Sequence, residues 1–218
     1  MNLPLLRGLA GTRRNLLFTA VVLATTAALP AVGAEAPDGL DAPLRRLYSA
    51  LETVMRSGHD TPFPRRFDKL APVVEQVFDL QTVLKLSIGP RWDSLNAEAQ
   101  ARLLQVYRRF IVATYVANFD SYDGQRFEIL PGVRDSGSDR IVATEIVTSN
   151  GDRQRLDYLL RNENGTWRAV DILLDGSISR VAVQRSDFRK ILASGDVDVL
   201  IANLRRKISD LSDGTLDS

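Results

Sequence analysis

Three carboxylates are the best candidates for catalysis in this chain of 218 residues. Glu145, Asp157 and Asp171 lie in neighbouring segments in which polar and apolar residues alternate, as they do in β-strands. Because alternate residues of a strand point to the same face, this parity places all three side chains on one face of a sheet. Paired carboxylates can act as acid and base if burial raises the pKa of one of them. The simpler interpretation, which we favour, is a solvated polar face with Arg126 and Arg155 as partners.

Other residue types that commonly carry chemistry are scarce. The chain has one histidine, His59, in the loop sequence Ser57–Asp60, and no cysteine. These counts exclude a zinc site built on several histidines or on thiolates, and no carboxylate cluster has ligand spacing. Gly132, Gly137 and Gly151 sit in separate turns rather than in a phosphate-binding loop, and no serine lies in a nucleophile-elbow pattern. We therefore predict a protein that is not an enzyme and that uses no metal or cofactor.

The first 34 residues have the features of a bacterial export signal. Arg7, Arg13 and Arg14 precede an apolar run, Leu16–Leu29, that is shorter than the about 20 residues of a membrane-spanning helix. Small residues predict cleavage after Ala34, and the adjacent arginines leave both the general and the twin-arginine export routes open. Cleavage would remove these three arginines and change the net charge of the chain from +1 to −2. A slightly negative net charge argues against nucleic-acid binding. We expect a periplasmic protein.

Helical spacing of apolar residues predicts helices at both ends of the mature chain. The segments are residues 44–55, 65–88, 96–119, 181–193 and 197–211. Pro72 and Asp79 are expected to break the second segment into two or three pieces, and Asn96 is a good N-cap for the longest helix. A linker at 35–43 and a polar tail at 212–218 flank these segments, which leaves one domain over residues 44–211.

The middle of the chain has the two-residue periodicity of strands. Four strands are predicted, over residues 126–130, 141–148, 154–160 and 166–174. Asn150-Gly151 and Asn164-Gly165 are strong signals for hairpin turns, which predicts an antiparallel meander with one wet and one dry face. The dry face should carry Phe127, Ile129, Val142, Ile146, Leu156, Tyr158, Leu160, Val170 and Ile172. Glu128, Glu145, Arg155, Asp157 and Asp171 should lie on the other face. These patterns predict an α+β fold in which helices cover the sheet.

Six short sequences carry a resemblance to a known family: Val83–Trp92, Tyr107–Phe110, Tyr115–Tyr122, Trp167–Ile172, Asp175–Arg180 and Gln184–Phe188. In their order and spacing they resemble the MlaC, or toluene-tolerance, family of periplasmic lipid-binding proteins. The likeness extends over residues 44–211 and is greatest to its hopanoid-associated HpnM branch. It implies a strongly curved antiparallel sheet of four or slightly more strands, packed against helices around an apolar cavity that takes acyl chains.

The same resemblance implies a function in lipid transport. It implies a monomeric carrier that shuttles a phospholipid or a hopanoid-type lipid between an inner-membrane transporter complex and an outer-membrane acceptor. Burial of a tail of about sixteen carbons would contribute roughly 10 kcal/mol. The residues that we predict to bind lipid are Phe78, Leu84, Phe110, Tyr115, Phe119, Phe127, Ile146, Tyr158, Ile172 and Phe188. For each of them a position in a filled core is the alternative, since composition does not distinguish a filled core from a hollow one.

Two other functions remain open at this point. The first is a non-catalytic scaffold of a membrane complex that carries no cargo. The second is an enzyme on a cone-shaped sheet that uses Glu145, Asp157 or Asp171 as a base.

Overall fold

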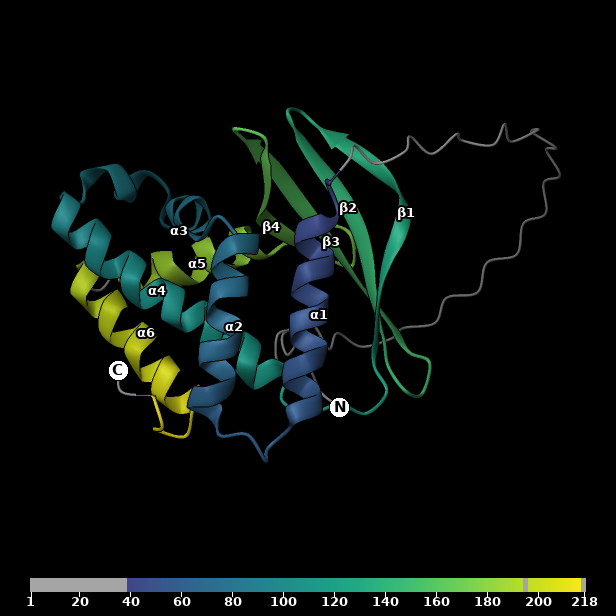
Figure 1. Cartoon of the computed structure of the whole chain (residues 1–218). Helices are drawn as coiled ribbons and strands as arrows, with labels where there is room; N and C mark the ends of the chain where they lie inside the picture. Colours follow the sequence, from purple (N-terminus) through teal and green to yellow (C-terminus); the bar gives the residue numbers. More distant parts are fainter. Residues whose placement is uncertain (1–38, 194–195, 217–218) are drawn as a thin grey trace, which may run out of the picture.

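The computed structural model describes residues 39–193 and 196–216 as an α+β fold (Figure 1). The helices are α1 (Ala42–Ser57), α2 (Phe63–Val77), α3 (Leu80–Ile88), the 3-10 helix η2 (Gly89–Ser94), α4 (Ala97–Asn118), α5 (Arg180–Ala193) and α6 (Val197–Leu211). The strands are β1 (Arg126–Ser136), β2 (Asp139–Val147), β3 (Arg153–Glu163), β4 (Thr166–Leu174) and β5 (Ile178–Ser179). The predicted export signal and the first part of the predicted linker lie outside the described residues.

The five strands form one antiparallel, curved and open sheet in the order β1-β2-β3-β4-β5, which confirms the predicted fold class. Its register confirms most of the predicted parity, because Phe127 pairs with Ile146 and Tyr158 pairs with both Val142 and Ile172. The β3–β4 register shifts at Leu159/Leu160, and Val170 has no partner in that ladder. A bulge inserts an extra residue into one strand, so the regular alternation of faces predicted for β4 is interrupted at Val170, which is buried.

A second irregularity lies in β1, an edge strand of the sheet formed by the described residues. The register with β2 is interrupted between Ile129 and Val133, where the chain contains Pro131 and Gly132. Gly132 has a φ of 88°, a left-handed conformation that glycine adopts without the steric cost of a Cβ atom. The ladder of β1 therefore has two separate paired stretches.

The α2–α3 junction connects the helices to the sheet. The predicted segment is broken into two helices at Phe78 and Asp79, as expected for Asp79, whereas Pro72 lies inside α2 and does not break it. Phe78 forms a parallel bridge to Ala169 of β4, and the Asp79 amide donates to the Ala169 carbonyl at 3.0 Å. The Asp79 carboxylate then accepts from the Thr82 amide at 3.0 Å and caps α3. This junction fixes Phe78 between the two layers.

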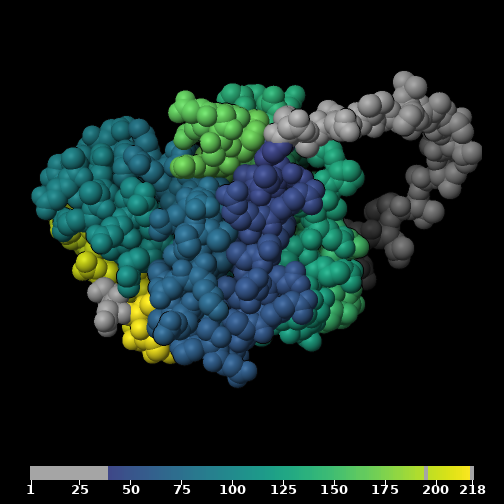
Figure 2. Space-filling view, in the orientation of Figure 1, coloured from purple at the N-terminus to yellow at the C-terminus, as the bar shows by residue number. Residues whose placement is uncertain are grey.

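The helices cover one face of the sheet (Figure 1). Tyr48 of α1 stacks on Phe127 with ring centroids 4.7 Å apart, and its hydroxyl donates to Thr144 of β2 at 2.6 Å. α1 and α2 lie side by side and form a continuous surface (Figure 2). Leu40 and Leu216 are also buried, so packed side chains extend beyond residues 44–211 at both ends. Among the described helices, none is long and apolar enough to span a membrane.

Candidate functional site

A cavity of about 150 Å³ lies between the inner face of the sheet and helices α3, α4 and α5. Its walls are mainly aliphatic and aromatic, with a few polar side chains. The lining residues are Phe78, Leu80, Val83, Tyr107, Phe110, Ile111, Thr114, Tyr115, Phe119, Ile146, Gln154, Leu156, Tyr158, Asp171, Ile172, Leu174, Arg180, Val181 and Gln184. Apolar walls with few polar groups are typical of sites for apolar small molecules.

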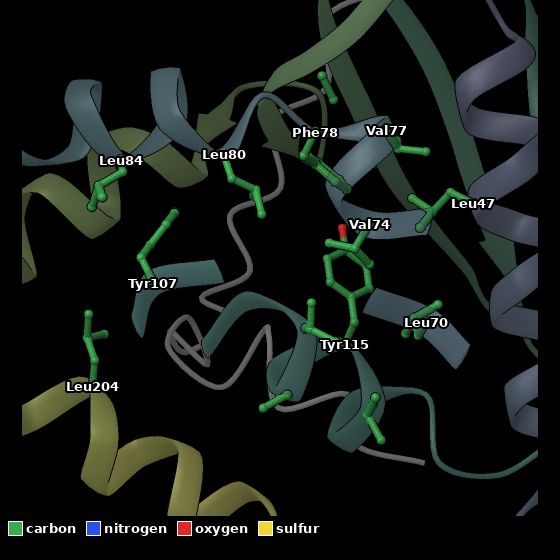
Figure 3. Packing of buried hydrophobic residues seen from close by; sticks show 14 of the residues in the cluster. Leu47, Leu70, Val74, Val77, Phe78, Leu80, Leu84, Tyr107, Tyr115 and Leu204 are labelled. Atoms are coloured by element: carbon green, nitrogen blue, oxygen red, sulfur yellow. The ribbon is translucent and has the colours of Figure 1, made fainter. Parts of the chain in front are cut away.

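Helix α4 forms one wall of the cavity with residues that lie on a single face of the helix. Tyr107, Ile111 and Tyr115 follow one another at intervals of four residues, and all three line the cavity. Ring contacts hold this wall in place: the centroids of Tyr115 and Phe119 are 5.9 Å apart, and those of Tyr115 and Phe78 are 5.7 Å apart. Figure 3 shows Tyr115 close to Phe78, and Tyr107 on the side of α3 and α6.

The structure brings together seven of the ten residues that we predicted to bind lipid. The cavity is lined by Phe78, Phe110, Tyr115, Phe119, Ile146, Tyr158 and Ile172. Their role in lipid binding stays a prediction.

Leu84, Phe127 and Phe188 lie in the core beside the cavity and do not line it. Phe127 has the parity of the inner face, but Tyr48 of α1 stacks on its ring. Phe188 packs edge-on against Tyr107 with centroids 6.3 Å apart. Leu84 is fully buried and lies on the same side of the interior as Tyr107 (Figure 3). Helical and strand periodicity identified these three as buried but did not show which helix would cover them.

Sequence reasoning missed the polar part of the lining. Thr114, Gln154, Arg180 and Gln184 line the cavity, and so does Tyr107. The predicted lipid-binding residues are apolar or aromatic residues of predicted apolar faces, which excludes arginine and glutamine. The signal that could have found two of them is the spacing of Arg180, Gln184 and Phe188 at intervals of four on one face of α5.

Four buried tyrosines surround the cavity or lie next to it. Burial raises the pKa of Tyr48, Tyr107, Tyr115 and Tyr158 above the ordinary tyrosine value. Tyrosine hydroxyls are protonated at neutral pH, and the raised pKa keeps these four protonated, as hydrogen-bonding groups, at more alkaline pH. The Tyr115 and Tyr158 side chains both belong to the buried core.

The three carboxylates considered for catalysis each have structural partners. The Glu145 carboxylate accepts from Arg153 at 2.6 Å, and the fully buried Asp157 pairs with Arg155 at 2.8 Å and with Arg134. Glu145 and Asp157 keep their predicted parity, opposite to that of Tyr158.

Asp171 is the one member of this trio that lines the cavity. Its carboxylate accepts from the Ile172 amide at 2.7 Å, the Val181 amide at 3.0 Å and the Ser179 hydroxyl. It therefore caps the start of α5. In the described part of the chain no group of three or more histidines, aspartates and glutamates could hold a metal ion.

Comparisons with known proteins agree with this architecture. A solved structure of a phospholipid-binding protein from Ralstonia solanacearum, in complex with a phospholipid, is similar to 79% of this chain and 98% of that chain. Its TM-score is 0.65 at 18% sequence identity, which shows a shared fold. No curated protein matches the sequence. The model of the family described as MlaC protein matches residues 46–206, so the chain belongs to the MlaC family.

Proposed function

We propose that this protein is a lipid carrier that holds the hydrocarbon part of a phospholipid in the cavity between its sheet and its helices. The observation that carries the proposal is the lining, in which aromatic and aliphatic side chains from two layers of the fold face a common space. Family membership and the fold shared with a phospholipid-binding protein support it. We propose no catalytic step, because Glu145, Asp157 and Asp171 are each engaged in ion pairs or hydrogen bonds.

The energetics of such a carrier follow from the apolar walls. Each buried CH₂ group contributes about 0.8 kcal/mol, so even part of an acyl chain offsets much of the cost of association. The cavity of about 150 Å³ is smaller than the roughly 300–1,000 Å³ of typical ligand pockets. Entry of a whole acyl chain therefore requires wall side chains to change rotamer. Phe110 and Ile111 are only partly buried, which leaves them room for such a change.

The cellular part of the proposal rests on the predicted export signal and the family. We propose that the protein works in the periplasm after cleavage near Ala34, as a monomer. There it would receive lipid from an inner-membrane transporter complex and pass it to an outer-membrane acceptor. A hopanoid is a second candidate cargo, supported by the likeness of the segments quoted above to the HpnM branch.

The test is to identify what the purified protein contains. The full chain, isolated from a bacterial periplasm, should release a phospholipid on organic extraction and show the matching mass increment in native mass spectrometry. Recovery of a polycyclic lipid instead would favour the hopanoid cargo. A protein that yields no lipid and takes up none from phospholipid vesicles would contradict the proposal.

A matched pair of variants locates the site. Thr114→Trp places a large ring in the cavity wall and should abolish lipid recovery. The Thr114 hydroxyl bonds to the Phe110 carbonyl of its own helix, so its loss should have little effect on folding. Arg108→Trp adds the same ring to an exposed position of α4 and should leave recovery unchanged.

A further inference from the structure

Two polar side chains of α5 interrupt the apolar wall of the cavity. Arg180 is the first residue of α5 and Gln184 follows four residues later, so both project from the same face of the helix. Both line the cavity. Both residues are partly buried, so the guanidinium and the amide lose part of their hydration and favour a polar partner.

The Gln184 side chain is held through its oxygen. The Tyr107 hydroxyl donates to Oε1 of Gln184 at 2.7 Å, and the Ser87 hydroxyl lies 2.9 Å from the same atom. Tyr107 and Ser87 are both buried, and burial raises the pKa of the Tyr107 hydroxyl, which keeps it a donor. The NH₂ group of Gln184 makes no hydrogen bond to any residue that the structure describes, and it offers two N–H donors.

Arg180 has no hydrogen bond or ion pair with the described residues, although its side chain is partly buried. Other arginines around the core are satisfied: Arg66 donates to the Thr61 carbonyl at 3.1 Å, and Arg155 pairs with Asp157. The charge of Arg180 acts on the lining tyrosines, since it lowers the pKa of Tyr107 and Tyr115, although burial outweighs it in both. Its guanidinium is therefore an available cation beside the cavity.

Asp171 is the one carboxylate among the lining residues, but its oxygens are already occupied. Its oxygens accept from two backbone amides and from the Ser179 hydroxyl at the start of α5. Its negative charge still repels any anion bound beside Arg180. This repulsion is greater for a ligand with two negative charges than for a ligand with one.

We propose that Arg180 and the amide of Gln184 bind the phosphate diester of a lipid whose hydrocarbon part lies in the apolar cavity. The inference rests on the proposed carrier function and adds a selectivity to it. A planar guanidinium donates two parallel hydrogen bonds to phosphate oxygens, and the Gln184 amide adds a neutral donor. The site therefore favours lipids with a singly charged phosphate diester over uncharged lipids of the same chain length.

The test compares two probes that share a palmitoyl chain and a glyceryl group. Palmitoyl-lysophosphatidylglycerol carries a phosphate diester, whereas monopalmitoylglycerol has none, and both are titrated into the delipidated full chain by calorimetry. Loss of hydrogen bonds to a charged group should make Arg180→Gln bind the lysophospholipid about tenfold or more weakly. The affinity of Arg180→Gln for monopalmitoylglycerol should stay within about twofold of that of the unchanged chain. Arg180→Lys keeps the charge without the planar fork and should recover part of the loss.

Arg189→Gln is the matched control, since it removes an exposed arginine from the same helix and should change neither affinity. Thermal unfolding of each variant checks that it is folded. Gln184→Glu provides a second route if Arg180→Gln does not fold, because it replaces the amide donors with a negative charge and should weaken only the lysophospholipid.

The outcomes separate this inference from the function on which it rests. If the unchanged chain binds neither palmitoyl lipid, the carrier function fails and the phosphate site fails with it. If it binds both but Arg180→Gln retains its preference for the lysophospholipid, only the phosphate site is refuted. Inorganic phosphate should not bind at the concentrations used for the lysophospholipid. If it binds equally well, the site takes free phosphate and the assignment to a lipid head group is wrong.

Discussion

Alkaline pH should unfold this protein steeply, because four of its five tyrosines are buried with raised pKa values. In the unfolded chain a tyrosine loses its proton near pH 10, whereas Tyr48, Tyr107, Tyr115 and Tyr158 keep theirs in the folded protein. The stabilising contribution of these groups is therefore complete below about pH 10 and declines as the pH rises above that value. Each tyrosine lowers the free energy of unfolding by about 1.4 kcal/mol per pH unit, and the four together by roughly 5–6 kcal/mol.

This slope sets the pH at which the fold is lost. A domain of ordinary stability, about 5–15 kcal/mol, would unfold between about pH 11 and pH 12.5. The assay is urea unfolding followed by circular dichroism at a series of pH values, with tyrosinate absorbance recorded in parallel. Absorbance should rise together with unfolding for the four buried residues.

Tyr158→Phe provides the control for other alkaline effects. It removes one titrating group and should reduce the slope by about 1.4 kcal/mol per pH unit. It should also cost roughly 1 kcal/mol at neutral pH through the lost hydroxyl. Ionisation of all five tyrosines near pH 10 with the fold intact would refute the reasoning, because it would show that these hydroxyls are not desolvated.

Three further predictions concern stability and can be measured by chemical denaturation. Leu70→Ala should cost about 2–5 kcal/mol, since Leu70 is fully buried, whereas Val199→Ala at an exposed position of α6 should cost much less; equal losses would contradict the assigned core. Asp79→Ala should cost about 0.5–2 kcal/mol by removing the cap of α3, and Asp79→Asn should restore most of it. Gly176→Ala should cost about 1–3 kcal/mol, because φ is 73° and a Cβ atom would lie 3.3 Å from the Arg155 side chain. An unchanged denaturation midpoint would argue against this conformation of Gly176.

Features fixed by local sequence were predicted well. Asn96 caps α4 as expected, its side chain accepting from the Ala99 amide at 2.8 Å. Asn164 and Gly165 both have positive φ in the β3–β4 turn, as their types indicate. Features that depend on contacts across the fold were missed: β5 has two residues and little periodicity, and the 3-10 helix that buries Trp92 lies between two predicted helical segments.

In the candidate site, too, local sequence predicted some features and contacts across the fold decided the others. Parity and helical spacing identified Tyr115, Tyr158 and Ile172 as inward-facing residues, because periodicity alone fixes which side of an element they occupy. Whether an inward residue meets a neighbour or open space depends on the position of other elements. Periodicity therefore did not separate Phe127, covered by Tyr48, from Ile146 beside it in the ladder.

The interrupted edge of β1 has a consequence for how this protein behaves at high concentration. An uncovered strand with a continuous row of amides and carbonyls can recruit a strand from a second molecule and start a growing assembly. Here the irregularity between Ile129 and Val133 divides that row, and Pro131 contributes no N–H to it. An incoming strand would find two short runs out of step with each other, so the irregularity protects the crowded protein against aggregation along this edge.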